Sequence, residues 1–134
     1  MTAREGAPRS GGAGPVLVVE DDADIRNAMA ELLEDEGYDC IVAEHRVDAL
    51  EALGRQTPSL VITDLLMPVM NGVELIGRLR SDARWSTLPV VVMTAEGQRI
   101  IGVDLESLKV PVLKKPVDVA SLANVLAEYS PGVL

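Results

Sequence analysis

The sequence predicts an α/β domain in which a doubly wound parallel sheet is covered by helices on both faces. Short apolar runs alternate along the chain with segments of helical spacing, in five strand–helix units. Most of these runs are apolar without polar alternation, which is typical of strands buried on both faces of a parallel sheet. Right-handed crossovers between such strands lead to a three-layer sandwich.

The chain has the size and composition of a single domain. It has 134 residues, 48% of them hydrophobic and only 2% aromatic, so Val, Leu, Ile and Ala must supply the packing. Residues 1–14 are rich in Gly, Ala, Ser and Pro and show no periodicity. We therefore predict a flexible tail over residues 1–14 and a folded domain over residues 15–134.

Five strands are expected in this domain. Apolar runs mark four of them, at Val16–Val19, Leu60–Thr63, Val90–Met93 and Val110–Leu113. A more polar segment, Asp39–Ala43, is expected to form a strand at the edge of the sheet, where one side faces solvent.

Helical spacing marks the segments between the strands. The first helix shows the i, i+3, i+4, i+7, i+8 pattern of one apolar face, and Gly37 supplies its stop. That face consists of Ile25, Ala28, Met29, Leu32 and Leu33. Further helices are expected around Val47–Leu53, Val73–Leu79, Ile101–Leu108 and Val119–Tyr129.

Charge and cysteine content exclude several classes of protein. The formal net charge of -9 argues against a nucleic-acid partner, because phosphate backbones are bound by clustered Lys and Arg. The single cysteine, Cys40, excludes an internal disulfide and fits a reducing compartment. No apolar run approaches the roughly 20 residues that span a bilayer, and the first residues lack the apolar core of a secretory signal. We predict a cytoplasmic protein without a membrane partner.

Charged and hydroxyl side chains follow the expected strands. Parallel sheets of this kind bind ligands beyond the carboxyl ends of their strands. The residues at those ends are Glu20-Asp21-Asp22, Asp64, Thr94 and Lys114-Lys115-Pro116. Asp22 is expected to cap the first helix, and each of the others has a structural explanation when it is taken alone. Together they place several carboxylates at one edge of the sheet, where a cation is needed to offset their repulsion.

This constellation suits magnesium-dependent phosphoryl chemistry. Mg²⁺ prefers oxygen ligands and is typically held by one or two carboxylates plus a phosphate. A carboxylate can act as a nucleophile and form an acyl phosphate. Asp64 is the best candidate, because it ends the central strand while Glu20 and Asp21 can hold the metal beside it.

Four ordered motifs resemble the receiver domains of two-component response regulators. They are Val18-Val19-Glu20-Asp21-Asp22 with Arg26, Asp64-Leu65-Leu66-Met67-Pro68-Val69-Met70-Asn71-Gly72, Val91-Val92-Met93-Thr94-Ala95, and Lys115-Pro116. The second is the most specific, because it is similar to the family's phosphoacceptor motif. The resemblance covers about residues 15–129 and implies a flavodoxin-like, CheY-like sheet with strand order 2-1-3-4-5.

The resemblance also implies a ligand set for the metal. Asp64 would be the phosphoacceptor. Asp21 and Asp64 would ligate Mg²⁺ through carboxylates, the backbone carbonyl of Leu66 would be a third protein ligand, and Glu20 would act through water.

Two further residues complete the implied site. Thr94 would donate to a phosphoryl oxygen, and Lys115 would pair with the phosphate. Lys115 is preferred over Lys114 because it directly precedes Pro116, with which it would form a cis peptide. The donor would be a sensor histidine kinase or a histidine phosphotransfer protein, and the output would be contact with a downstream protein. We therefore predict a signalling acceptor and not an enzyme.

The segment before Lys115 departs from the family pattern. The family usually carries Gly-Ala and an aromatic residue there, whereas this chain reads Leu108-Lys109-Val110-Pro111-Val112-Leu113. Val112 stands at the position of the aromatic switch residue. We expect Val112 to pack as a core residue of the strand, and phosphorylation to change the surrounding face only modestly.

Three alternative functions are weighed against this reading. A phosphatase of the haloacid dehalogenase type would need Asp-x-Asp, but residue 66 is leucine. A flavodoxin-like nucleotide or flavin module would need a phosphate loop after the first strand, where an acidic triplet stands instead. A non-phosphorylated pseudo-receiver that only makes protein contacts stays open because of the altered fifth strand.

Overall fold

The predicted α/β class is confirmed by a computed structural model, which describes residues 14–64, 72–95, 111–115 and 117–129. Five parallel strands form one sheet in the order β2-β1-β3-β4-β5. The strands are β1 (Val16–Val19), β2 (Cys40–Ala43), β3 (Leu60–Asp64), β4 (Val90–Ala95) and β5 (Val112–Lys115). The described helices are α1 (Ala23–Asp35), α2 (Arg46–Arg55), α3 (Gly72–Arg80) and α5 (Val119–Tyr129). Within these ranges no helix has both the length and the apolar character needed to cross a bilayer.

Two of the predicted segments fall on residues that the structure does not describe. One is the tail, of which residues 1–13 lie outside the described ranges, and the other is the helix around Ile101–Leu108. The remaining predicted helices and strands are all present, and most of their ends lie within two residues of the expected positions.

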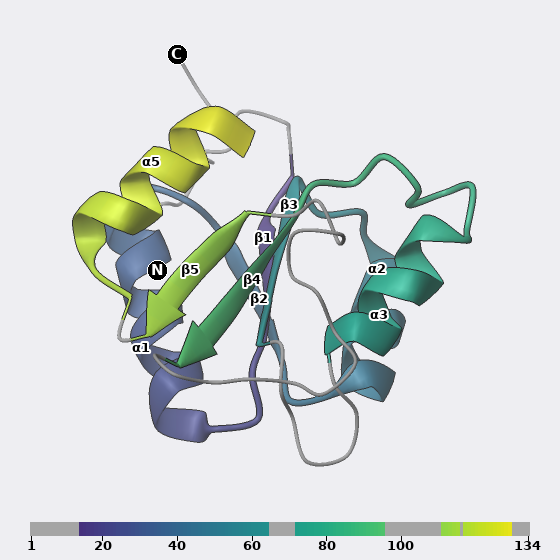
Figure 1. Cartoon of the computed structure of the whole chain (residues 1–134), viewed down its shortest axis with the longest axis horizontal. Helices are drawn as coiled ribbons and strands as arrows, with labels where there is room; N and C mark the ends of the chain where they lie inside the picture. The colour runs from purple at the N-terminus through teal and green to yellow at the C-terminus, as the bar shows by residue number, and fades with distance from the viewer. Residues whose placement is uncertain (1–13, 65–71, 96–110, 116, 130–134) are drawn as a thin grey trace.

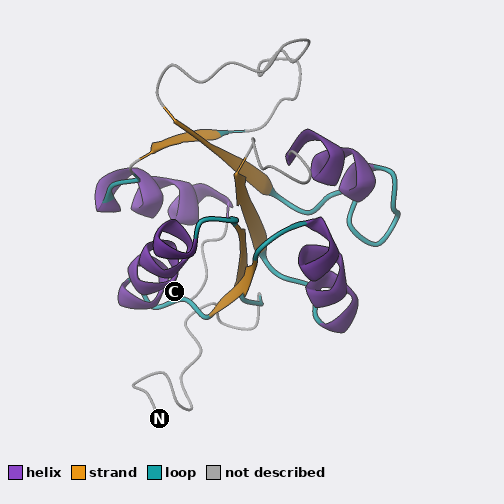
Figure 2. Cartoon of the chain, turned by 90° about the horizontal axis from the view of Figure 1, so that it is seen from below, coloured by secondary structure: helices purple, strands orange, loops and turns teal. Residues whose placement is uncertain are grey.

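Helices cover both faces of the sheet. Figures 1 and 2 show α1 and α5 on one side and α2 and α3 on the other. Because neighbouring strand residues point to opposite faces, the central strands contribute to both cores. The strand residues on the α1/α5 side include Val16, Val18, Leu60, Ile62, Val91, Met93 and Leu113. Those on the α2/α3 side include Leu17, Val19, Val61, Val90 and Val92.

Helix α1 begins and ends where its sequence indicates. Asp22 Oδ1 accepts hydrogen bonds from the backbone N–H groups of Asp24 at 2.9 Å and Ile25 at 3.1 Å, so the predicted N-cap is confirmed. After the last turn, Gly37 adopts a φ of 92°, which is the left-handed conformation that favours glycine at a helix end. The cap directs the chain from the acidic segment into α1.

Strand β5 differs from its prediction in position and in burial. The strand covers Val112–Lys115, whereas the prediction was Val110–Leu113, of which Val110 lies outside the described residues. Its later end arises because β4 extends to Ala95 and provides Lys115 with a partner in register. The prediction that Val112 is a core residue is wrong, since its exposure is 39% whereas Leu113 is buried. Side chains alternate along this edge strand, so Val112 faces the α2/α3 side of the sheet while Leu113 faces the α1/α5 side. Helix α2 packs on β1 and β2, toward the opposite edge of the sheet from Val112.

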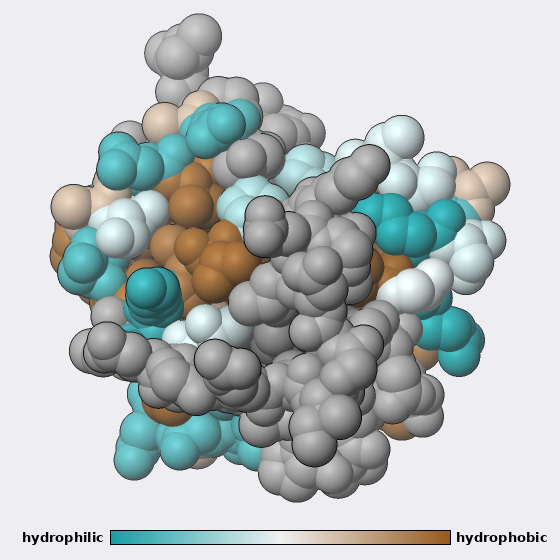
Figure 3. Space-filling view, viewed as in Figure 1, coloured by the Kyte–Doolittle hydropathy of each residue, from teal (hydrophilic) through white to brown (hydrophobic). Residues whose placement is uncertain are grey.

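Apolar surface is exposed near β5 and α5. Figure 3 shows apolar atoms on the face where Figure 1 places these two elements. Val112 on β5 and Val119 on α5 are among the exposed large apolar side chains.

The segment between α3 and β4, residues 81–89, forms a compact turn at the amino end of β4. Arg80 Nη1 donates to the backbone carbonyl of Leu88 at 2.9 Å and lies 3.5 Å from that of Ser86. Trp85 is buried against the α2/α3 core, and the guanidinium carbon of Arg84 lies 4.2 Å from the centre of its ring. The charged side chains Asp82 and Arg84 of this turn thus pair with each other, and Arg80 at the end of α3 binds backbone carbonyls of the turn.

Candidate functional site

Strand alternation brings three charged side chains to the same side of the sheet. Glu20, Asp64 and Lys115 each lie two positions after a strand residue that packs against α1 and α5. Those apolar residues are Val18, Ile62 and Leu113. Because β3 pairs with both β1 and β4, and β4 pairs with β5, the three charged residues meet at the carboxyl edge.

Lys115 bridges the two buried carboxylates. Its Nζ lies 2.8 Å from Glu20 Oε1 and 3.1 Å from Asp64 Oδ2. The side chains of Glu20 and Asp64 are 1% and 5% exposed, so water contributes little to their solvation. The neighbouring Lys114 points to the other face and is exposed.

Burial controls the ionisation of this group. Burial raises the pKa of Glu20 above its ordinary value, and the nearby Asp64 carboxylate acts in the same direction, against hydrogen bonds from Lys115 and the Asp22 N–H. Burial alone would lower the pKa of Lys115, but contact with Glu20 and Asp64 outweighs it and leaves the pKa raised. Lys115 therefore stays an ammonium, and Glu20 carries its charge at a cost.

A third carboxylate joins the two buried ones. Carboxylate oxygens of Glu20, Asp21 and Asp64 all lie within 4.8 Å of one another, and Asp21 is the exposed member. Glu20 Oε1 is buried, and among the described residues it has no donor other than the Lys115 ammonium at 2.8 Å. All-oxygen donors at this spacing, one of them under-satisfied, fit a small divalent cation such as Mg²⁺.

The backbone that carries these acids is held at several points. The Glu20 N–H donates to the Ala43 carbonyl at 3.0 Å, and Glu20 Oε2 accepts from the Asp22 N–H at 3.1 Å. Arg26 Nη1 on α1 donates to the Glu20 carbonyl at 2.9 Å and lies 3.5 Å from the Asp21 carbonyl. The acidic motif included Arg26, but sequence reasoning assigned it no role.

The remaining predictions for the site concern Thr94, the Leu66 carbonyl and the Lys115–Pro116 peptide. Thr94 is buried near the end of β4, one residue beyond Met93, the register partner of Asp64. Met93 packs on the α1/α5 side, so the strand pattern directs Thr94 to the other side, and its contact with a phosphoryl oxygen stays a prediction. The Leu66 carbonyl and the Lys115–Pro116 peptide lie outside the described residues.

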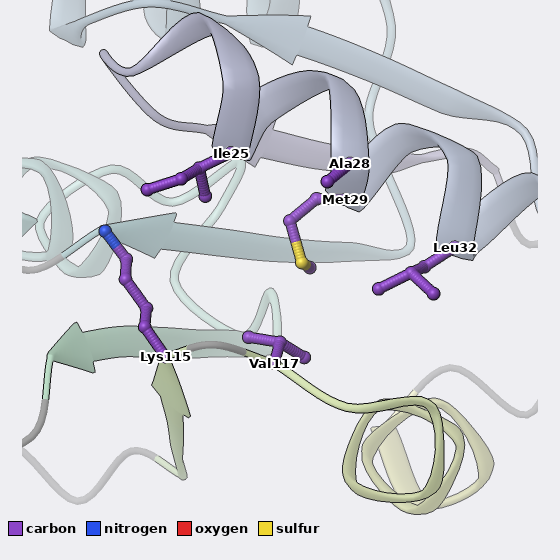
Figure 4. A pocket seen from close by; sticks show the side chains of 6 residues that line it. All are labelled: Ile25, Ala28, Met29, Leu32, Lys115 and Val117. Carbon is purple, nitrogen blue, oxygen red and sulfur yellow. The ribbon is translucent and has the colours of Figure 1, made fainter.

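An apolar cavity of about 360 Å³ lies beside the cluster. Figure 4 shows one face of α1 and Val117 directed toward it, with the Lys115 stem along its side. The α1 residues that line it are Ile25, Ala28, Met29 and Leu32. The stem of Lys115 thus borders an apolar cavity while its ammonium contacts the two buried carboxylates.

The single cysteine, Cys40, is poorly suited to thiol chemistry at neutral pH. Burial, helped by the charge of Glu34, raises the pKa of the Cys40 thiol to about 12. Because the thiolate is the nucleophilic form, Cys40 is a poor nucleophile. Carboxylates remain the candidates for covalent chemistry.

The chain was compared with protein families and with known proteins. Residues 16–127 match the response regulator receiver domain family. The chain is 40% identical over 117 residues to an uncharacterised 14.6 kDa protein of Leptolyngbya boryana, a match that covers 85% of this chain and 88% of that protein. It is 32% identical over 123 residues to the phosphate regulon transcriptional regulatory protein PhoB of Pseudomonas aeruginosa. That match covers 87% of this chain but only 53% of PhoB, so the chain spans about half of this relative.

Solved structures share the fold over nearly the whole chain. A sensor protein from Polaromonas sp. JS666 superposes with a TM-score of 0.79 at 31% identity, over 88% of this chain and 96% of that one. A response regulator receiver protein from Pseudomonas putida gives 0.76 at 32% identity, over 86% and 96%. The sheet order, the acidic edge and these matches lead to one conclusion: the chain belongs to the response regulator receiver domain family, the signalling domains of two-component systems.

Proposed function

We propose that residues 15–134 form a phosphoacceptor domain in which Asp64 receives a phosphoryl group. The position of Asp64 carries this proposal: it is the last residue of the central strand β3, and its buried carboxylate lies 3.1 Å from the Lys115 ammonium. Glu20 and Asp21 provide further carboxylates within 4.8 Å. A nucleophile, a cation and metal ligands therefore meet at one point.

The phosphodonor is a phosphohistidine of a sensor histidine kinase or of a histidine phosphotransfer protein. A carboxylate oxygen of Asp64 forms the new O–P bond while the N–P bond of the donor breaks. The imidazole leaves with the electron pair of that bond and takes a proton from solvent. The product is an acyl phosphate on Asp64, which signals through contact with a downstream protein in the cytoplasm.

The remaining residues of the site supply charge and position. Lys115 already contacts Asp64 and can pair with a phosphoryl oxygen. Thr94 lies near the end of β4 at the same edge, and its hydroxyl would turn toward the phosphoryl group to donate to another oxygen. Glu20, Asp21 and Asp64 are the residues that would hold Mg²⁺, with the Leu66 carbonyl outside the described part of the chain. When bound, Mg²⁺ neutralises charge on the transferring phosphoryl group.

Intact-mass analysis with acetyl phosphate tests the proposal. We expect the protein to gain one phosphoryl group in the presence of Mg²⁺ and far less after chelation. Asp64→Asn keeps the size of the side chain but removes the nucleophile, so it should not be labelled while its circular dichroism spectrum stays that of the wild type. Labelling of Asp64→Asn at the wild-type rate would exclude Asp64. A folded wild-type protein that is never labelled would support the pseudo-receiver alternative.

A further inference from the structure

Arg26 makes its recorded contacts to the backbone of the acidic segment. Its Nη1 donates to the Glu20 carbonyl at 2.9 Å and lies 3.5 Å from the Asp21 carbonyl. A charged donor forms stronger hydrogen bonds than a neutral one, and the planar guanidinium fixes their direction. These two carbonyls belong to the two consecutive residues whose carboxylates reach toward Asp64.

The Glu20 carboxylate is itself held by the Asp22 N–H at 3.1 Å and by Lys115 at 2.8 Å, whereas the other backbone contacts lie on either side of the two carbonyls. On the strand side, the Glu20 N–H is bound by Ala43 of β2. On the helix side, the Asp22 side chain is occupied with capping α1. The peptide that joins Glu20 to Asp21 lies between them, and Asp21 itself is exposed. Arg26 is therefore placed to hold the peptide from which both side chains extend.

We propose that Arg26 is a positioning residue for the metal site, and that its guanidinium holds the Glu20–Asp21 backbone so that both carboxylates converge on Asp64. This inference rests on the proposed Mg²⁺ site. Groups that orient metal ligands without touching the metal are worth roughly 10–100-fold in metal affinity. Since Arg26 contacts carbonyl oxygens, the carboxylates stay available to a cation.

The molecule contains a matched control. Arg80 Nη1 holds the carbonyls of Leu88 and Ser86 at 2.9 and 3.5 Å, the same two distances, at the opposite end of the sheet. Arg80→Met therefore removes an equivalent pair of contacts and the same charge, far from the carboxylates. A loss shared by both variants reflects general destabilisation, whereas a loss confined to Arg26 reflects positioning.

The test is calorimetric titration of the metal-free protein with MgCl₂. We expect Arg26→Met to weaken Mg²⁺ binding roughly 10-fold and Arg80→Met to leave it unchanged. The sign is informative, because removing a positive charge beside carboxylates would by itself strengthen cation binding. Arg26→Lys keeps the charge but lacks the planar fork, so we expect a smaller loss. Labelling of Arg26→Met by acetyl phosphate should recover at saturating Mg²⁺.

The outcomes separate this inference from the proposed function. Wild-type protein that binds no Mg²⁺ would overturn both. If the wild type binds Mg²⁺ and Arg26→Met binds it equally or more tightly, the positioning role alone is wrong. Thermal melts establish that each variant is folded; should Arg26→Met not fold, wild-type affinity in Arg26→Lys would overturn the inference.

Discussion

The two ends of the sheet use the same contact in opposite surroundings. At the amino end of β4, Arg80 holds two carbonyls of a turn whose other charges are also paired, with Arg84 contacting Asp82 at 2.9 Å and covering Trp85. At the carboxyl edge, Arg26 holds two carbonyls in the same way, but beside three carboxylates and one ammonium. At the amino end the charged groups of the turn are paired with one another. At the carboxyl edge, three of the described carboxylates lie together with one ammonium.

Because of this difference, we expect the amino end of the sheet to contribute mainly to stability and the carboxyl edge mainly to Mg²⁺ binding. Substitutions at the amino end should change the free energy of unfolding and leave Mg²⁺ binding intact. Substitutions at the carboxyl edge should act on Mg²⁺ binding, and some of them should stabilise the metal-free protein, because they relieve repulsion between like charges. The following changes test that separation.

The largest loss of stability is expected from Trp85→Ala at the amino end. Trp85 is 6% exposed and belongs to the α2/α3 core, so its truncation should lower the free energy of unfolding by about 3–5 kcal/mol. Urea denaturation measures this loss, and titration with MgCl₂ should give an affinity within a factor of two of the wild type. A folded Trp85→Ala protein with strongly weakened Mg²⁺ binding would contradict the separation.

A smaller loss is expected from Lys115→Met at the carboxyl edge. The change keeps the stem that packs beside the cavity but leaves Glu20 and Asp64 without their ammonium. Breaking such a pair should cost about 2 kcal/mol in the metal-free protein, less than for a fully buried pair because Lys115 is 17% exposed. Denaturation with and without saturating Mg²⁺ should show a much smaller cost with metal. An equal cost in both conditions would mean that Mg²⁺ does not replace the lost charge.

The smallest effect on stability, and of opposite sign, is expected from Asp21→Ala. Asp21 is the exposed member of the carboxylate cluster, so its removal should raise the metal-free stability by about 0.5 kcal/mol. The same change should weaken Mg²⁺ binding at least about 10-fold and reduce the rise in melting temperature that Mg²⁺ causes by mass action. Calorimetric titration and thermal melts measure the two effects. Unchanged Mg²⁺ affinity would exclude Asp21 as a ligand.

Most of the fold could be predicted because the strands and helices have strong local patterns. β1 was predicted with its observed bounds, and the caps of α1 at Asp22 and Gly37 follow from side-chain chemistry and backbone freedom. β5 was displaced, because its extent depends on pairing with β4 and not on its own apolar run. The burial of Val112 was wrong for a related reason: local sequence does not show what covers an edge strand.

The sequence predicted which charged residues lie at the carboxyl edge but not how they contact one another. Strand ends located Glu20, Asp64 and Lys115, and the rule for parallel sheets brought them together. The sequence does not show that Lys115 bridges both carboxylates, since this depends on the pleat of three strands. The contacts of Arg26 were also missed, because no rule for residue types pairs an arginine with backbone carbonyls. The spacing of an arginine one turn into the helix after an acidic segment is the signal that was available.

The order of the strands also has a consequence for how the domain folds. The charged group draws on the first, third and fifth strands, and β5 joins the sheet only through β4. Contacts between such distant parts of a chain form late, because closing long loops costs entropy before any contact repays it. A chain without β5 would contain the acids but lack the ammonium that balances them. The complete charged group should therefore form only once β5 has joined the sheet, and partly folded chains should lack the lysine that the proposed phosphoacceptor site needs beside Asp64.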